Sequence, residues 1–152
     1  MHLQVRLAPR SSPPDVEKVL GLVADAGINL VGVGGSDVEF GGELALVPEE
    51  GRDGDLVKAL KQYSPRVLYA DDPDSGLRLC IVDDTPGALH RCLRDVASDN
   101  LGRGRIIRDI LVGVPNEEQK AANEVPVHVY SEVVRTPASL DAGASGSTAY
   151  SD

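Results

Sequence analysis

The sequence predicts an α+β protein whose sheets are antiparallel and carry their helices on one face. Three observations lead to this fold class. Short segments of alternating polarity indicate half-buried strands, segments with apolar residues three and four positions apart indicate helices, and the order of these segments begins again midway along the chain. Hydrophobic residues make up 41% of the sequence and aromatic residues only 3%, so we expect a core of Val, Leu, Ile and Ala.

The first half of the chain follows the order strand, helix, strand, strand, helix, strand. The first helix begins at Asp15, whose carboxylate suits the unpaired amides there, and ends at Gly27, which can adopt a left-handed conformation. The second helix is expected at residues 55–63, and the four strands at residues 3–7, 28–34, 43–47 and 66–70. This is the ferredoxin-like βαββαβ order.

The pattern begins again after Asp71–Gly76, a polar segment that we interpret as a hinge. Strand-like alternation over 77–81 matches that over 3–7, and helical spacing over 89–97 matches that over 16–24. Strands are then expected at 105–114 and 125–134, but no second helix or fourth strand follows. We therefore predict a complete unit over residues 1–72, a truncated βαββ unit over residues 76–135, and a disordered tail over residues 136–152, which contains little to bury.

The truncated unit should leave an open sheet edge, which favours pairing with a neighbouring strand. Both units could share one continuous sheet, and we expect a homodimer that extends it.

A net charge of −9 argues against nucleic acid as a partner, because a phosphate backbone is held by Lys and Arg. We interpret Arg103, Arg105 and Arg108 as solvated surface charges. No apolar run approaches the ~20 residues that span a bilayer, and no signal peptide is recognisable, so we expect a cytoplasmic protein without membrane contact.

The residues of common metal and redox sites are too scattered to predict a cofactor or a metal centre. Cys80 and Cys92 lie among apolar neighbours and are interpreted as small buried hydrophobic residues. Asp71, Asp72 and Asp74 fit a solvated linker better than a cation site.

The strongest local signal is the segment Asp83–Leu89, which joins an apolar strand to an amphipathic helix. Gly87 lets a ligand approach the backbone, and Pro86 suits the first helical turn. The first amides of a helix carry partial positive charge and suit a carboxylate, while Asp84 or Thr85 can cap them in the absence of a ligand. The alternative is a well-capped turn without a ligand.

This succession resembles the start of ACT domains: a strand, then the motif Asp-x-Pro-Gly-x-Leu, then a helix. ACT domains are small regulatory modules that commonly bind amino acids. In the first unit, Ala24–Leu30 resembles the end of the family's first helix and the entry to its second strand. The resemblance implies side-by-side units with an amino-acid effector at their interface.

The positions that carry over from the second unit are Asp84, Thr85, Pro86, Gly87, Ala88 and Leu89, and those from the first unit are Asn29, Leu30 and Val31. The equivalent loop of the first unit, residues 9–15, has no Gly, and the helix end at 99–104 lacks Gly-Ile-Asn. We therefore expect one composite site rather than a symmetric pair.

These observations favour a regulatory module, not an enzyme, that binds a small amino acid and acts through assembly or a partner protein. One alternative is a ligand-free structural or interaction subunit with the same fold. Another is a small ferredoxin-like enzyme that uses Asp83 or Asp84 with His90 or His128 in one cleft.

Overall fold

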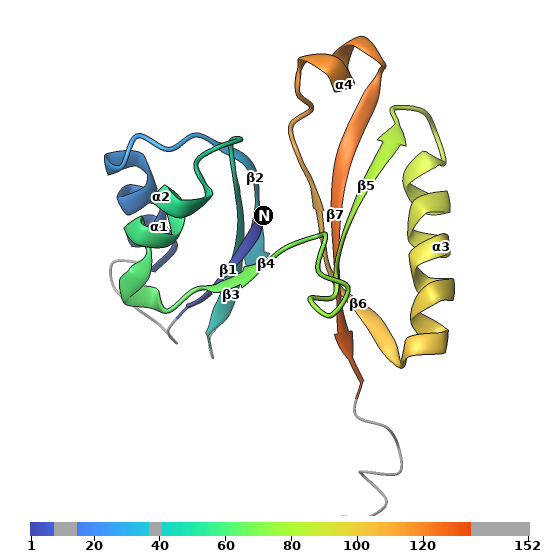
Figure 1. Ribbon diagram of the computed structural model, residues 1–152, viewed down its shortest axis with the longest axis horizontal. Coiled ribbons are helices and arrows are strands. Elements are labelled where there is room, and N and C mark those ends of the chain that lie inside the picture. Colours follow the sequence, from blue (N-terminus) through green and yellow to red (C-terminus); the bar gives the residue numbers. More distant parts are fainter. Residues whose placement is uncertain (8–14, 37–40, 135–152) are drawn as a thin grey trace, which may run out of the picture.

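The computed structural model describes residues 1–7, 15–36 and 41–134, which form two sheets, each with helices on one face (Figure 1). The first sheet has the strand order β2-β3-β1-β4, with every neighbouring pair antiparallel. Its elements are β1 (His2–Leu7), α1 (Asp15–Asp25), β2 (Leu30–Ser36), β3 (Gly42–Pro48), α2 (Asp53–Ala59) and β4 (Arg66–Leu68). This arrangement, called the first unit below, confirms the predicted ferredoxin-like order.

The second sheet has the strand order β5-β7-β6, again antiparallel throughout. Its elements are β5 (Leu77–Asp83), α3 (Ala88–Arg103), β6 (Arg105–Val112), α4 (Glu117–Ala121) and β7 (Glu124–Val133). These strands correspond to the first three of a ferredoxin-like unit, and in the described residues no fourth strand lies beside β5. The truncated βαββ form of this second unit is therefore confirmed.

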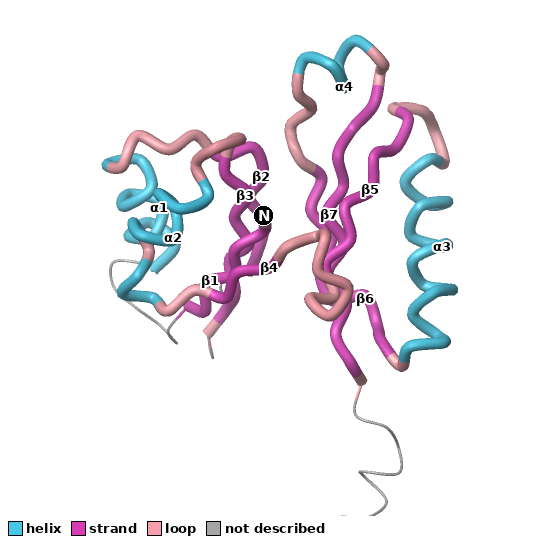
Figure 2. The backbone as a smooth tube through the Cα atoms, viewed as in Figure 1, coloured by secondary structure: helices cyan, strands magenta, loops and turns pink. Residues whose placement is uncertain are grey.

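The two sheets stack face to face, so the layers run helices, sheet, sheet, helix (Figures 1 and 2). The two units therefore do not share one continuous sheet, which the sequence left as a possibility. The physical reason lies on β2 and β3, which turn small residues toward the second unit and let Leu111 of β6 pack closely against them. A Cβ atom on Gly32 would lie 2.5 Å from Leu111 Cδ2, which shows how close the approach is.

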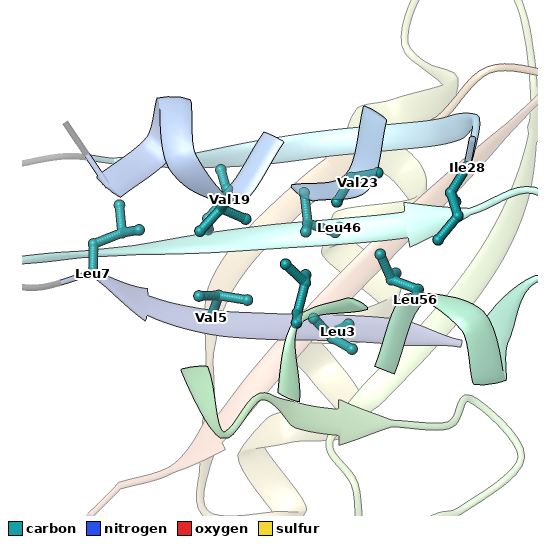
Figure 3. Close-up of a cluster of buried hydrophobic side chains, with 10 residues drawn as sticks. Leu3, Val5, Leu7, Val19, Val23, Ile28, Leu46 and Leu56 are labelled. Carbon is teal, nitrogen blue, oxygen red and sulfur yellow. The ribbon is translucent and has the colours of Figure 1, made fainter. Parts of the chain in front are cut away.

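The core of the first unit lies between its sheet and the helices α1 and α2 (Figure 3). The alternation predicted for β1 turns Leu3, Val5 and Leu7 into this core, where all three are buried. Val19 and Val23 of α1 meet them from the helix side. The period-2 and helical patterns thus converge on one apolar layer.

The core of the second unit is smaller and lies beneath α3. Val96 of α3 packs on Val127 and Val129 of β7. Cys80 and Cys92 border this cluster and are half-buried free thiols, not the fully buried residues that we expected. Burial and a hydrogen bond with Cys80 raise the pKa of Cys92 to about 11.

The elements differ from the sequence prediction chiefly at β2, at the second helix and at α4. β2 begins two residues late because Gly27 (φ 66°) closes α1 and the Ile28 amide bonds to the Val23 carbonyl at 3.2 Å. The helix expected at 55–63 divides into α2 and a 3-10 turn at Lys61–Tyr63. α3 ends at Arg103, within the helix end expected at 99–104. α4 was not expected, although Asn116 and Gln119 form a capping box at its start.

The linker, residues 69–76, is an ordered turn rather than an open hinge. The Ser75 hydroxyl donates to the Tyr69 and Asp72 carbonyls at 2.8 Å each, and the Asp74 amide donates to Asp72 Oδ1 at 2.9 Å. The Gly76 carbonyl accepts from the Ser131 amide at 2.9 Å, which attaches the linker to β7.

The predicted tail at 136–152 and most of the loop at 9–15 lie outside the described residues. In the part of the chain that the structure describes, none of the helices has the length and apolar character needed to cross a bilayer.

Candidate functional site

The turn between β5 and α3, residues 83–88, is exposed apart from Ala88 and held by backbone hydrogen bonds. The Asp84 amide donates to the Asn123 carbonyl at 2.8 Å, and the Thr85 amide donates to the Asp83 carbonyl at 2.9 Å. Gly87 has a φ of 84°, and the only atom within 4 Å of a Cβ built there is Arg91 Nη1, at 3.0 Å. The backbone of this turn is therefore fixed, and its surface is open.

The capping arrangement differs from the one predicted. Gly87 itself is the N-cap of α3, and no side chain, neither Asp84 nor Thr85, hydrogen-bonds to the first amides. Pro86 consequently lies before the helix rather than in its first turn. The reason is local: the Ala88 amide closes a turn onto the Thr85 carbonyl at 3.2 Å, which moves the helix start past the proline. The first amides of α3 carry no side-chain cap, as an anion-binding turn requires.

The other predicted segment, Asn29–Val31, leads into β2, an edge strand of the first sheet. Asn29 is exposed, and its backbone exchanges hydrogen bonds with Glu49, at 2.9 Å to the Glu49 amide and 3.4 Å to Glu49 Oε1. The Val31 carbonyl accepts from the Val114 amide at 2.7 Å, just beyond β6. Leu30 is half-buried against the core of the first unit.

The two predicted segments belong to different layers of the molecule. Among the described residues, no hydrogen bond, ion pair or apolar cluster joins residues 84–89 to residues 29–31. Figure 1 shows β2 in one sheet and the turn at the outer end of the other unit. A site that combines both segments therefore needs a second copy of the chain.

A cleft of about 390 Å³ opens at the opposite end of α3. It lies between the linker, the start of β5, the last turns of α3 and the start of β6, and small-molecule sites have volumes in this range. Residues from all four segments line it: Pro73, Gly76, Arg78, Asn100, Arg103 and Arg105.

The charge in this cleft is mostly positive. Arg78 Nη1 contacts Asp99 Oδ2 at 2.5 Å, and that hydrogen bond raises the pKa of Arg78. Arg105 donates only to the carbonyls of Pro73 and Asp74, at 3.4 and 3.5 Å. Sequence reasoning assigned Arg103 and Arg105 to solvated surface, because nothing in the pattern showed that Arg78 would join them.

Polar side chains are buried between the two sheets. His2 of β1 and His128 of β7 are 1% and 8% exposed, and their ring centroids lie 5.8 Å apart at 40°. Within the described part of the chain, no hydrogen-bond partner lies at either nitrogen of His2, at Nδ1 of His128 or at Nε2 of Gln4. Burial lowers the pKa of each histidine to about 4, so both rings are neutral near pH 7.

A pair of carboxyl groups also lies at this junction. Burial raises the pKa of Glu43 on β3, and the neighbouring Asp109 on β6 raises it further. The pKa of Asp109 is raised mainly by burial as well. In the described residues, no group of three or more His, Cys, Asp or Glu side chains is placed to hold a metal ion.

The enzymatic alternative required a histidine and an aspartate in one cleft. His128 faces the first sheet, whereas the flanking Val127 and Val129 face α3, which carries the exposed His90. The sheet therefore separates His128 from His90, and the turn aspartates Asp83 and Asp84 are exposed. Among the described residues, no hydrogen bond or ion pair joins Asp83 or Asp84 to His90 or His128.

No protein-family model matches the chain, and no curated protein matches its sequence. Among solved structures it is similar to protein BT0572 from Bacteroides thetaiotaomicron, with a TM-score of 0.56, 18% identity, and coverage of 86% of this chain and 78% of that chain. At this identity the likeness concerns the fold alone. A "putative glycine cleavage system transcriptional repressor" aligns over 95% of this chain and 88% of its own at 12% identity, but its TM-score of 0.34 carries no argument.

Proposed function

We propose that this protein is a regulatory module that binds a small amino acid at the β5–α3 turn and acts through assembly or a partner protein. The observation that carries the proposal is the geometry of the turn. Its backbone is fixed, its surface is exposed, and the first amides of α3 have no side-chain cap. A carboxylate can approach these amides beside Gly87, where the side-chain atom near a built Cβ is the cationic Arg91 Nη1, at 3.0 Å.

The second half of the proposed site comes from Asn29, Leu30 and Val31 of another copy. In the described residues, β2 and β5 are edge strands of their sheets. The Val31 carbonyl is already bonded to the Val114 amide, so a second molecule would approach β5 and the exposed Asn29. The Asn29 side chain is exposed and can both donate to a carboxylate and accept from an ammonium group. A homodimer would thus bring the two segments together, and the ligand would bias assembly by binding the dimer better than the monomer.

Thermal shift and calorimetry against a panel of amino acids test this function. We expect at least one amino acid to stabilise the protein at millimolar concentration. Gly87→Asp should remove that stabilisation, because its carboxylate would occupy the space beside the amides. Gly51→Asp is the matched control, because Gly51 has a φ of 82° and no atom near its Cβ position. The two substitutions therefore introduce similar backbone strain, but Gly51→Asp leaves the β5–α3 turn unchanged.

A panel without any stabilising amino acid would contradict the proposal. Equal ligand responses in the Gly87→Asp and Gly51→Asp variants would contradict the site assignment.

A second candidate function, a ligand-free interaction subunit, is favoured by apolar residues on the open strands of the second sheet. Leu79 and Ile81 of β5 are 46% and 45% exposed, and Val112 of β6 is 54% exposed. This candidate predicts a stable complex whose mass, measured by light scattering, does not respond to amino acids.

A monomer at micromolar concentration, with or without amino acids, would remove the support for a homodimer.

A further inference from the structure

The cleft at the end of α3 has more positive charge than its own carboxylates neutralise. Asp99 is paired with Arg78, and neither Arg103 nor Arg105 forms an ion pair within the described residues. The nearby linker aspartates do not compensate, since Arg105 bonds to backbone carbonyls there. In a chain with a net charge of −9, such a concentration of unpaired guanidinium groups is unexpected from composition.

The existing bonds of these arginines are weak enough to be exchanged. Charge-assisted hydrogen bonds are commonly ~2.7–2.9 Å long, whereas those of Arg105 measure 3.4 and 3.5 Å. The Arg103 side chain makes no hydrogen bond within the described residues, although Arg103 lines the cleft. Both guanidinium groups are therefore available to an oxyanion.

The floor of the cleft is polar and fixed. Asn100 and Ser131 are buried, and Asn100 Nδ2 donates to Ser131 Oγ at 2.9 Å. Gly76 forms part of the wall, because a Cβ there would lie 2.2 Å from the Ser131 carbonyl oxygen. This floor supplies oriented neutral groups beneath the arginines, as sites for small polar ligands commonly do.

We propose that this cleft is a second binding site, distinct from the β5–α3 turn, for a small anion that carries a carboxylate or phosphate group. Arg103 and Arg105 bind the oxyanion, Arg78 remains paired with Asp99, and the linker closes one wall. Because the linker joins the two units, occupancy of the cleft stabilises the linker against β7.

Calorimetric titration of the full chain with inorganic phosphate and with citrate tests the proposal. We expect one or both to bind, and Arg103→Gln to weaken that binding about tenfold, the loss typical of one charge-assisted hydrogen bond. Arg94→Gln is the matched control, since Arg94 is an exposed arginine of α3 that does not line the cleft. Arg103→Lys should retain part of the affinity, because it keeps the charge without the planar fork.

Arg103 also lies in the last turn of α3, where a cation favours the helix dipole. If that were its only role, Arg103→Gln would lower the melting temperature and leave anion affinity equal to that of Arg94→Gln, which would overturn the proposal. Failure of both phosphate and citrate to bind would overturn it as well. Gly87→Asp should leave anion binding unchanged, so the two proposed sites fail or succeed separately.

Discussion

The imidazole rings of His2 and His128 are buried side by side between the two sheets. Three of their four nitrogens have no hydrogen-bond partner among the residues that the structure describes, so protonation would place a charge between the sheets with no such residue's carboxylate bonded to it. A buried polar group without a partner is costly, and a buried charge more so. The folded protein therefore selects the neutral form of both rings.

The stability of the protein should consequently fall on acidification. The pKa of His2 and of His128 is about 4 in the folded state and 6.5 as the ordinary value, so the unfolded chain binds more protons between these limits. Each ring can remove up to ~3 kcal/mol as pH falls through this window, with full stability above it. Urea unfolding across the window, compared between the natural chain and His2→Leu, measures the effect.

The comparison with His2→Leu is needed because Glu43 and Asp109 act in the opposite direction. Their raised pKa values mean that protonation relieves a buried carboxylate as pH falls. His90→Gln, at an exposed position, should leave the profile unchanged. Identical losses of stability in the natural chain and His2→Leu would show that the buried ring does not govern the profile.

At the scale of elements, the linker depends on one glycine. Gly76 has a φ of 77° and lies against the backbone of β7, where no side chain fits. The sequence placed Gly76 at the end of a polar hinge, but the contact that makes it indispensable comes from Ser131, far along the chain. The local sequence pattern predicts a turn at Gly76, but the contact of this turn with Ser131 can be seen only in the folded structure.

Gly76→Ala should destabilise the protein by ~2 kcal/mol or more, because the new methyl group adds a backbone clash to the strain of a positive φ. Gly102→Ala on α3 is the control: it has open space around it, and a helical alanine is favoured by up to ~1 kcal/mol. Denaturant titration of both variants measures the difference. Equal stabilities would mean that the linker does not pack on β7.

At the scale of the whole molecule, the sequence predicted which strand residues face the helices. It did not predict that the opposite face of the first sheet would be buried too. Alternation at β1 placed Leu3 and Val5 toward the helices, as observed. The same alternation placed His2 and Gln4 on the other face, which a single sheet would expose, and both are buried by the second unit. Small residues such as Gly32 on this face were the available signal of close approach.

The candidate sites divide in the same way. The turn at 83–88 could be located because strand, turn and helix are contiguous in sequence. The cleft could not, because Arg78, Arg103 and Arg105 meet only after the second unit folds and the linker packs against it. A site whose side chains come from separate elements produces no periodic pattern in the sequence, so the sequence does not predict it.

The packing between the sheets can be tested at Leu111. This side chain is buried against Ala45 and Val47 of the facing sheet. Leu111→Ala should cost ~2–3 kcal/mol of unfolding free energy, whereas Leu101→Ala, at a side chain that is 86% exposed, should change it by less than ~0.5 kcal/mol. Equally mild effects in denaturant unfolding would contradict face-to-face stacking of the units.

The histidine pair also gives the protein a native spectroscopic reporter. The chain contains three histidines, and the third, His90, is exposed on α3. Aromatic rings 5.8 Å apart perturb each other's magnetic shielding, so the imidazole proton resonances of His2 and His128 register the separation of the two sheets. With His90 as an internal reference, a proton spectrum without any introduced label would follow the opening of the units as ligands, anions or acid are added.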